Sequence, residues 1–197
     1  MIERHVYLDF HIDTNRINSQ LKLKYMNVLE QWHERDIIYI AMSEVAQKEA
    51  VKNGDGDRAE KAYAYVATET LARTSDELKV LRQIQELLFP HGIKSRNEWN
   101  DVEVVFNAHK YFAILITNDG GSGRQPNGIL GKTNKLREMG IQVLRDYEAV
   151  ELVKRKIIAR DQRAREFAST AGALLPDWVG KDLDVLEDTA TTLGLYV

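Results

Sequence analysis

The sequence predicts an α/β fold of three layers, in which a central parallel β-sheet lies between helices. Segments with strand and helix patterns alternate along the chain, in the order β-α-β-α-α-α-α-β-α-β-α. The strand segments are short and rich in β-branched residues, which is typical of parallel strands buried on both faces. The chain has 197 residues, which is enough for one well-buried domain.

Each element follows from a pattern of apolar residues and from the turn residues that bound it. The predicted strands are 5–12, 37–42, 113–117 and 141–144. The predicted helices are 16–34, 43–51, 57–72, 74–89, 101–111, a short one that ends at Met139, 147–174 and one near 180–193. Ser43 is a suitable N-cap, and Thr74 with Glu77 forms a capping-box pattern. Residues 93–100 are predicted to be a polar connection.

The stretch from Asp101 to Asp119 carries the first functional signal. We expect Asp101 at the start of its helix, where a carboxylate suits the free N–H groups, and Asp119 just beyond the following strand. A helix packed antiparallel to the strand that follows it brings these two ends to the same edge of the sheet. In open α/β folds, sites form at that edge, beside the carboxyl ends of the strands.

Composition excludes several classes of protein. The chain contains no cysteine, so it has neither disulfides nor thiolate metal sites. No apolar run approaches the roughly 20 residues of a membrane span, and the N-terminal segment lacks the apolar core of a signal peptide. We therefore expect a cytoplasmic protein. The net charge of −3 does not by itself indicate a nucleic-acid partner.

Four carboxylates are predicted near the carboxyl-end edge of the sheet: Asp13, Glu49, Asp101 and Asp119. Four clustered carboxylates cannot all stay ionised unless a positive charge compensates them. Mg²⁺ or Mn²⁺ would do so with oxygen ligands, and such a site supports in-line hydrolysis of a phosphodiester. The alternative is structural, because an isolated Asp is more often a cap or a solvated charge.

Several segments resemble one known family. They read FHIDTNRIN, MSEVAQKEAV, DVEVVFNAHKYFAILITND and LREMGIQVL, and they are similar to the motifs of PIN-domain proteins, the metal-dependent ribonucleases that include VapC-type toxins. The resemblance covers about residues 1–150. It implies a PIN-like nuclease domain over 1–150 with extra helices, and a C-terminal helical extension over 151–197 packed on it.

The resemblance also implies roles for particular residues. Asp13, Glu49, Asp101 and Asp119 would form the acidic site, with Asp13, Asp101 and Asp119 as ligands of Mg²⁺ or Mn²⁺. The supporting residues would be Thr14, Asn15 and Thr117. Glu44 lies on the same helix as Glu49, so the helix acid could be either. The loop Gly120-Gly121-Ser122 departs from the family, whose members often carry a charged and an aromatic residue there.

The implied function is endonucleolytic hydrolysis of RNA, by a homodimeric toxin that an antitoxin protein neutralises. Two alternatives stay open: a non-catalytic PIN-like scaffold that binds RNA or a protein, and a metal-dependent nuclease that acts on DNA flaps or structured ends. The added helices and the altered loop after Asp119 favour the scaffold.

Other charged motifs have simpler interpretations. Gly131-Lys132-Thr133 lacks the glycine of a P-loop, because Pro126 stands in its place. A basic loop near the acids could still hold a phosphate, and its candidates are Arg124, Lys132, Lys135 and Arg137. A second basic run is predicted to be a solvated helix face; it consists of Lys154, Arg155, Lys156, Arg160, Arg163 and Arg165.

Overall fold

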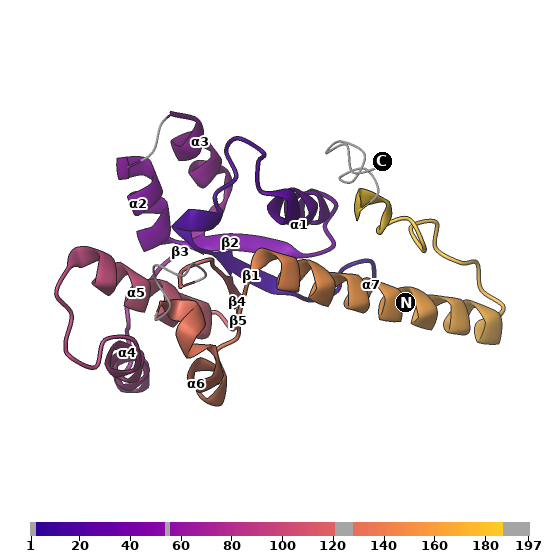
Figure 1. Cartoon of the computed structure of the whole chain (residues 1–197). Helices are drawn as coiled ribbons and strands as arrows, with labels where there is room; N and C mark the ends of the chain where they lie inside the picture. Colours follow the sequence, from indigo (N-terminus) through magenta and orange to yellow (C-terminus); the bar gives the residue numbers. More distant parts are fainter. Residues whose placement is uncertain (1–2, 54–55, 121–127, 187–197) are drawn as a thin grey trace.

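A five-stranded, all-parallel sheet forms the centre of the computed structural model, which describes residues 3–53, 56–120 and 128–186. The strands are β1 (Asp9–Ile12), β2 (Tyr39–Ser43), β3 (Val66–Thr68), β4 (Ile114–Ile116) and β5 (Val143–Leu144). Their order across the sheet is β3-β2-β1-β4-β5 (Figure 1).

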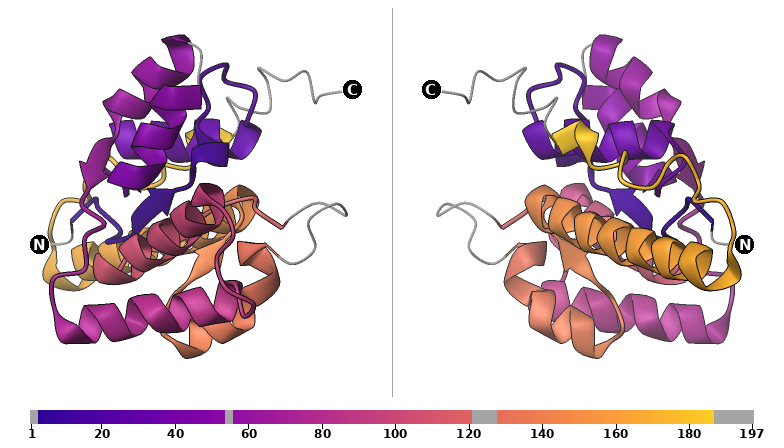
Figure 2. Two further views of the ribbon diagram at one scale, coloured as in Figure 1. Left: turned by 90° about the vertical axis from the view of Figure 1, so that its left-hand side faces the viewer. Right: turned by 90° about the vertical axis from the view of Figure 1, so that its right-hand side faces the viewer.

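Helices flank this sheet on both faces (Figures 1 and 2). They are α1 (Lys24–Glu34), α2 (Glu44–Asn53), α3 (Gly56–Ala64), α4 (Ser75–Leu88), α5 (Arg96–Lys110), α6 (Thr133–Glu138) and α7 (Asp146–Ala171), with the 3₁₀ turns η1 (Thr14–Arg16) and η2 (Ile129–Lys132). The crossovers from β1 to β2 and from β3 to β4 run in opposite directions, so right-handed connections put α1 and α5 on opposite faces. α1 packs against α7, and α4 packs against α5. The predicted three-layer α/β fold with a parallel sheet is confirmed.

Two predicted helices are shorter than expected, because a strand takes the place of the end of one and a 3₁₀ turn with a loop takes the place of the start of the other. The helix predicted over 57–72 ends at Ala64, and the edge strand β3 follows it. Three residues, of which Val66 is 55% exposed, give too little apolar pattern to identify a strand. Likewise α1 begins at Lys24 rather than residue 16, because η1 and a loop come first. The Asn18 side chain accepts a hydrogen bond from Leu23 N within that loop.

The start of α5 corrects the expected position of Asp101. The helix begins at Arg96, where the Ser95 hydroxyl accepts a hydrogen bond from Glu98 N (3.2 Å) and the Glu98 carboxylate accepts one from Ser95 N (3.2 Å). This capping box lies in the segment predicted to be a connection. Asp101 therefore lies in the second turn of α5, not at its N-terminus. The capping box predicted at Thr74 is confirmed.

The chain after α7 turns back toward α1 (Figures 1 and 2). Gly172 ends α7 in the left-handed conformation (φ +62°), and Val185 is fully buried in the main core. The helix predicted near 180–193 begins at residue 184, and its part beyond 186 lies outside the described residues. α7 crosses residue 150 without a break. The division of the chain into a domain over 1–150 and an extension over 151–197 stays a prediction.

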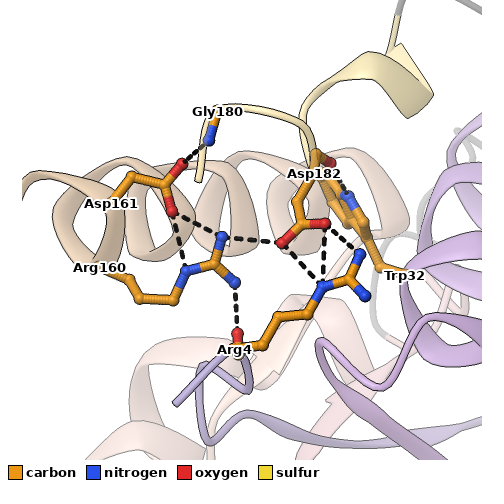
Figure 3. A network of polar contacts seen from close by, with 6 residues as sticks. All are labelled: Arg4, Trp32, Arg160, Asp161, Gly180 and Asp182. Atoms are coloured by element: carbon orange, nitrogen blue, oxygen red, sulfur yellow. Dashed lines mark hydrogen bonds and ion pairs between the residues drawn. The ribbon is translucent and has the colours of Figure 1, made fainter. Parts of the chain in front are cut away.

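A buried network of charges holds this returning segment (Figure 3). The Asp182 carboxylate, 0% exposed, accepts hydrogen bonds from Arg160 Nη2 (2.8 Å) and Arg4 Nη2 (2.5 Å). Its backbone oxygen accepts one from Trp32 Nε1 (2.7 Å). Arg160 also binds Asp161 through Nε (2.9 Å) and Nη2 (2.6 Å). The prediction of a solvated basic face was therefore wrong for Arg160, which is 2% exposed, because the N-terminal segment at Arg4 and the returning segment with Trp178 and Asp182 contact it.

No helix in the described part of the chain is long and apolar enough to cross a membrane.

Candidate functional site

The strand order reverses at β1 and β4, and we call the region at the carboxyl ends of these two strands the β1/β4 crevice. From β1 the chain moves outward through β2 to β3, and then returns to β4 on the other side of β1. In open α/β sheets such a reversal leaves room for a ligand at the carboxyl ends of the two central strands. Asp13 follows β1 directly and Thr117 follows β4 directly, so both residues lie at this crevice.

Asp13 is buried at the crevice and surrounded by neutral donors. Its Oδ1 accepts a hydrogen bond from Thr14 N (2.6 Å). Its Oδ2 accepts one from Asn15 Nδ2 (2.5 Å) and one from the Thr117 hydroxyl (2.7 Å). The side chain is thus fixed in orientation, while no described cation forms an ion pair with it. The structure therefore brings together Asp13 and all three residues expected to support the acids.

Thr117 links Asp13 to Asp119. While the Thr117 hydroxyl donates to Asp13, it accepts hydrogen bonds from Asp119 N (3.0 Å) and Asn15 Nδ2 (3.2 Å). The Asp119 carboxylate is held from the other side, because its Oδ2 accepts a hydrogen bond from Ile129 N (2.7 Å) at the start of η2. The loop geometry after β4 therefore sets the position of Asp119 relative to Asp13.

Glu49 and Asp101 approach from α2 and α5. Glu49 Oε2 accepts a hydrogen bond from Asn100 Nδ2 (3.2 Å), so these two helices are joined beside the crevice. Asn100 is 8% exposed, and its buried Oδ1 has no hydrogen-bond partner among the described residues. Glu44 instead pairs with Lys48 along the exposed side of α2. Of the two candidate acids on α2, Glu49 is the one whose charge raises the pKa of Asp13.

The four acids share one electrostatic environment. Burial, followed by the negative charges of Asp13, Asp119 and Glu49, raises the pKa of the Asp101 carboxyl to about 8. Burial also raises the pKa of Asp13, against the opposing effect of its hydrogen bonds, and the charges of Asp119 and Glu49 act in the same direction. Without a bound cation the site therefore favours the protonated forms of Asp13 and Asp101, and a bound cation would favour their ionised forms.

Asp101 is expected to make the free energy of unfolding depend on pH. In the metal-free fold it keeps its proton up to about pH 8, whereas the unfolded chain releases it near the ordinary pKa of 3.8. Stability should then fall as pH rises from about 4 to 8, by at most about 1.4 kcal/mol per pH unit. Asp101→Asn should flatten this slope and be more stable than wild type at pH 8.

Urea denaturation in EDTA at several pH values across that window measures this slope. Added Mn²⁺ should stabilise the wild type at pH 8 and leave Asp101→Asn almost unchanged. Identical pH slopes for the two proteins would show that Asp101 does not hold a proton in the fold.

The side chains of the site are of a kind that binds a hard divalent cation, but the described carboxylates do not lie close enough together to bind one ion jointly. In the described part of the chain, no three His, Asp or Glu side chains lie close enough to hold an ion as they stand. The available donors are nevertheless all oxygens: the carboxylates and the unpartnered Asn100 Oδ1. Oxygen donors with excess negative charge suit Mg²⁺ or Mn²⁺, and Mg²⁺ usually keeps several of its waters.

Two arginines near the acids were not found from the sequence. Arg58 Nη2 donates to the backbone oxygen of Thr14 (2.7 Å), and Arg16 pairs with Asp146 (2.9 Å). Both contacts join segments far apart in the chain, so no local pattern indicates them. Of the expected phosphate-binding residues, Lys132 ends η2, Lys135 and Arg137 lie on α6, and Arg124 lies outside the described residues.

The close approach at Gly128 leads to a further expectation. A Cβ at this position would lie 2.6 Å from Gly120 N and closer still to Asp119 Oδ2. Gly128→Ala should therefore displace Asp119, lower the affinity for Mn²⁺ and cost about 1–3 kcal/mol of stability, as overpacking does. Calorimetric titration and urea denaturation measure both effects. Gly56→Ala is the control, because a Cβ there meets no atom of the described residues within 4 Å. Equal effects of the two changes would contradict this explanation.

Comparisons with known proteins find similarity to solved structures. No protein-family model matches the chain, and no curated protein matches it. The chain is similar to VapBC2 from Rickettsia felis bound to a DNA fragment from their promoter, with a TM-score of 0.46 and 16% identity, over 70% of this chain and 98% of that chain. At this TM-score the similarity supports no inference about activity or partners.

Proposed function

We propose that this protein is a metal-dependent endoribonuclease that hydrolyses RNA phosphodiester bonds. One observation carries the proposal. Asp13, Glu49, Asp101 and Asp119 lie close enough at the β1/β4 crevice for their charges to act on one another, and the pKa values of Asp13 and Asp101 are raised. The resemblance of the surrounding segments to PIN-domain motifs supports the same chemistry. The nuclease reaction would need a cation that compensates the negative charges of these four acids.

Asp13, Asp101 and Asp119 would hold Mg²⁺ or Mn²⁺, which would supply an activated water and neutralise charge during in-line displacement at phosphorus. Thr117 and Asn15 hold Oδ2 of Asp13, and the backbone N–H of Thr14 holds Oδ1. Asn100 holds Glu49 through Oε2, so Oε1 is the oxygen available to take the proton from the attacking water. Asp101 would give up its proton when it binds the cation.

The rim of the crevice offers cations for the substrate. Arg58 donates to the carbonyl of Thr14, the residue after Asp13, and Lys132 and Lys135 follow Asp119 along the chain. These residues, with Arg124, which lies outside the described residues, would hold the backbone phosphates. Membership of a toxin–antitoxin pair, an antitoxin partner, a homodimer and cytoplasmic residence stay predictions from the resemblance and the composition.

Cleavage of a labelled single-stranded RNA tests the proposal. Products should form with Mn²⁺ or Mg²⁺ and not with EDTA, and matched single-stranded DNA and DNA-flap substrates should be cut more slowly. No products from RNA with either metal, or equal rates with and without EDTA, would refute it. Faster cleavage of the flap substrate would favour the alternative of a nuclease that acts on DNA.

A non-catalytic scaffold is the second candidate, and one observation favours it. Both oxygens of Asp13 are already occupied by neutral donors, and no three described acids stand at ligand distance. Calorimetric titration with Mn²⁺ separates the candidates: absence of binding at millimolar Mn²⁺ would support the scaffold, whereas saturable binding that Asp101→Asn abolishes would support the metal site.

A further inference from the structure

An exposed pair of tyrosines lies at the same edge of the sheet as the acids. Tyr25 is in the first turn of α1 and Tyr147 in the first turn of α7, and their ring centroids are 6.1 Å apart. The residues are 39% and 45% exposed. Both helices have their N-termini at the carboxyl-end edge, because α1 runs back to the start of β2 and α7 follows the end of β5.

This pair is tied to the acidic site by a partly buried ion pair. Arg16 is the last residue of η1, which begins directly after Asp13. Its Nη1 lies 2.9 Å from Asp146 Oδ2, and the two side chains are only 11% and 14% exposed. Asp146 Oδ1 in turn accepts a hydrogen bond from Tyr147 N (2.9 Å). The position of the Tyr147 ring relative to Asp13 is therefore set by defined contacts.

The chemistry around the rings suits an anionic strand with unstacked bases. Lys24 Nζ lies 5.7 Å from the Tyr25 ring centroid, so a cation accompanies the aromatic surface. Proteins that bind single strands combine cations for the backbone with aromatic side chains on which bases stack. Bases inside a duplex are already stacked on one another, whereas those of single-stranded RNA are free to use such a surface.

We propose that Tyr25 and Tyr147 form a base-stacking platform for single-stranded RNA, next to the phosphate that enters the acidic site. The choice of RNA as the ligand rests on the proposed nuclease function. The position of the platform beside the acidic site rests on the contacts of Arg16, Asp146 and Tyr147. A strand whose phosphate reaches Asp13 then places a neighbouring base on the Tyr147 ring. The platform selects unpaired RNA over duplex RNA.

The test is the affinity for a fluorescein-labelled single-stranded RNA oligonucleotide, measured by anisotropy in EDTA so that no cleavage occurs. Tyr25→Ala and Tyr147→Ala are each expected to weaken binding about 5- to 150-fold, the range for loss of one stacked base. Tyr147→Phe keeps the ring and should bind as the wild type does. A duplex of the same sequence should compete poorly.

Tyr39→Ala is the matched control. Tyr39 is 37% exposed and also contacts an aromatic ring, that of His33, but it begins β2 at the opposite edge of the sheet. Its replacement should leave the affinity unchanged. Wild-type affinity in both Tyr25→Ala and Tyr147→Ala, absence of single-strand binding by the wild type, or equal competition by the duplex would each overturn the platform.

Cleavage assays of the same variants separate this inference from the proposed nuclease. Tyrosine-dependent binding without any cleavage would keep the platform and refute the nuclease. Metal-dependent cleavage that is unchanged in rate and KM by Tyr25→Ala and Tyr147→Ala would keep the nuclease and refute the platform.

Discussion

Asp13→Asn is expected to abolish metal-dependent RNA cleavage while leaving the protein folded. The Asp13 carboxylate accepts three hydrogen bonds. In the Asn variant an NH₂ group, itself a donor, would replace one oxygen and face at least one of these donors. The change also removes a negative charge from the cation site. The loss should exceed the roughly 10- to 100-fold cost of removing an outer-shell partner of a metal ligand. Initial rates on labelled single-stranded RNA with Mn²⁺ measure it.

Two variants make this result specific. Thr117→Val removes the hydroxyl that orients Asp13 without touching the acid, and should cost about 10- to 100-fold, as an outer-shell residue does. Asp9→Asn changes the exposed aspartate at the opposite end of β1 and should have no effect. Undiminished cleavage by Asp13→Asn, or equal losses in Asp13→Asn and Asp9→Asn, would contradict the assignment of Asp13 to the site.

Asp182→Asn is expected to give the largest loss of stability, about 3–5 kcal/mol, because it breaks a buried ion pair on one side only. Asp182 is fully buried between Arg4 and Arg160 (Figure 3). Its neutral replacement leaves Arg160 with Asp161 as its remaining carboxylate partner among the described residues. The amide also points a donor at two guanidinium groups.

The midpoint and slope of urea denaturation measure this loss. Asp184→Asn is the matched control, since Asp184 lies in the same segment, is exposed and forms no ion pair with a described residue. It should change stability by less than about 0.5 kcal/mol, as surface substitutions usually do. A similar small effect for Asp182→Asn would show that the returning segment does not depend on the network.

The sequence placed those site residues that adjoin a strand. Asp13, Thr117 and Asp119 were located because each follows an apolar strand run within three residues, and the parallel sheet brings such ends together. Asp101 was assigned to the wrong turn of its helix. The Ser95–Glu98 capping box would have corrected that error, since the same signal at Thr74 was recognised.

Contacts between distant segments could not be predicted in this way. Arg58 reaches Thr14 across 44 residues, and Asn100 reaches Glu49 across 51, with no periodic pattern to indicate either contact. Arg160 has the local sequence of an exposed basic helix, and contacts with Arg4 and with the returning C-terminal segment bury it. Such residues become visible once the topology fixes which elements are neighbours.

The most direct test of the central claim is the anomalous density of Mn²⁺ in a crystal soaked with that ion. The four acids are expected to enclose one peak at the β1/β4 crevice, within about 2.0–2.5 Å of oxygens from Asp13, Asp101 and Asp119, the range for hard cations. No peak there at millimolar Mn²⁺, or a peak bound only by other residues, would contradict the account.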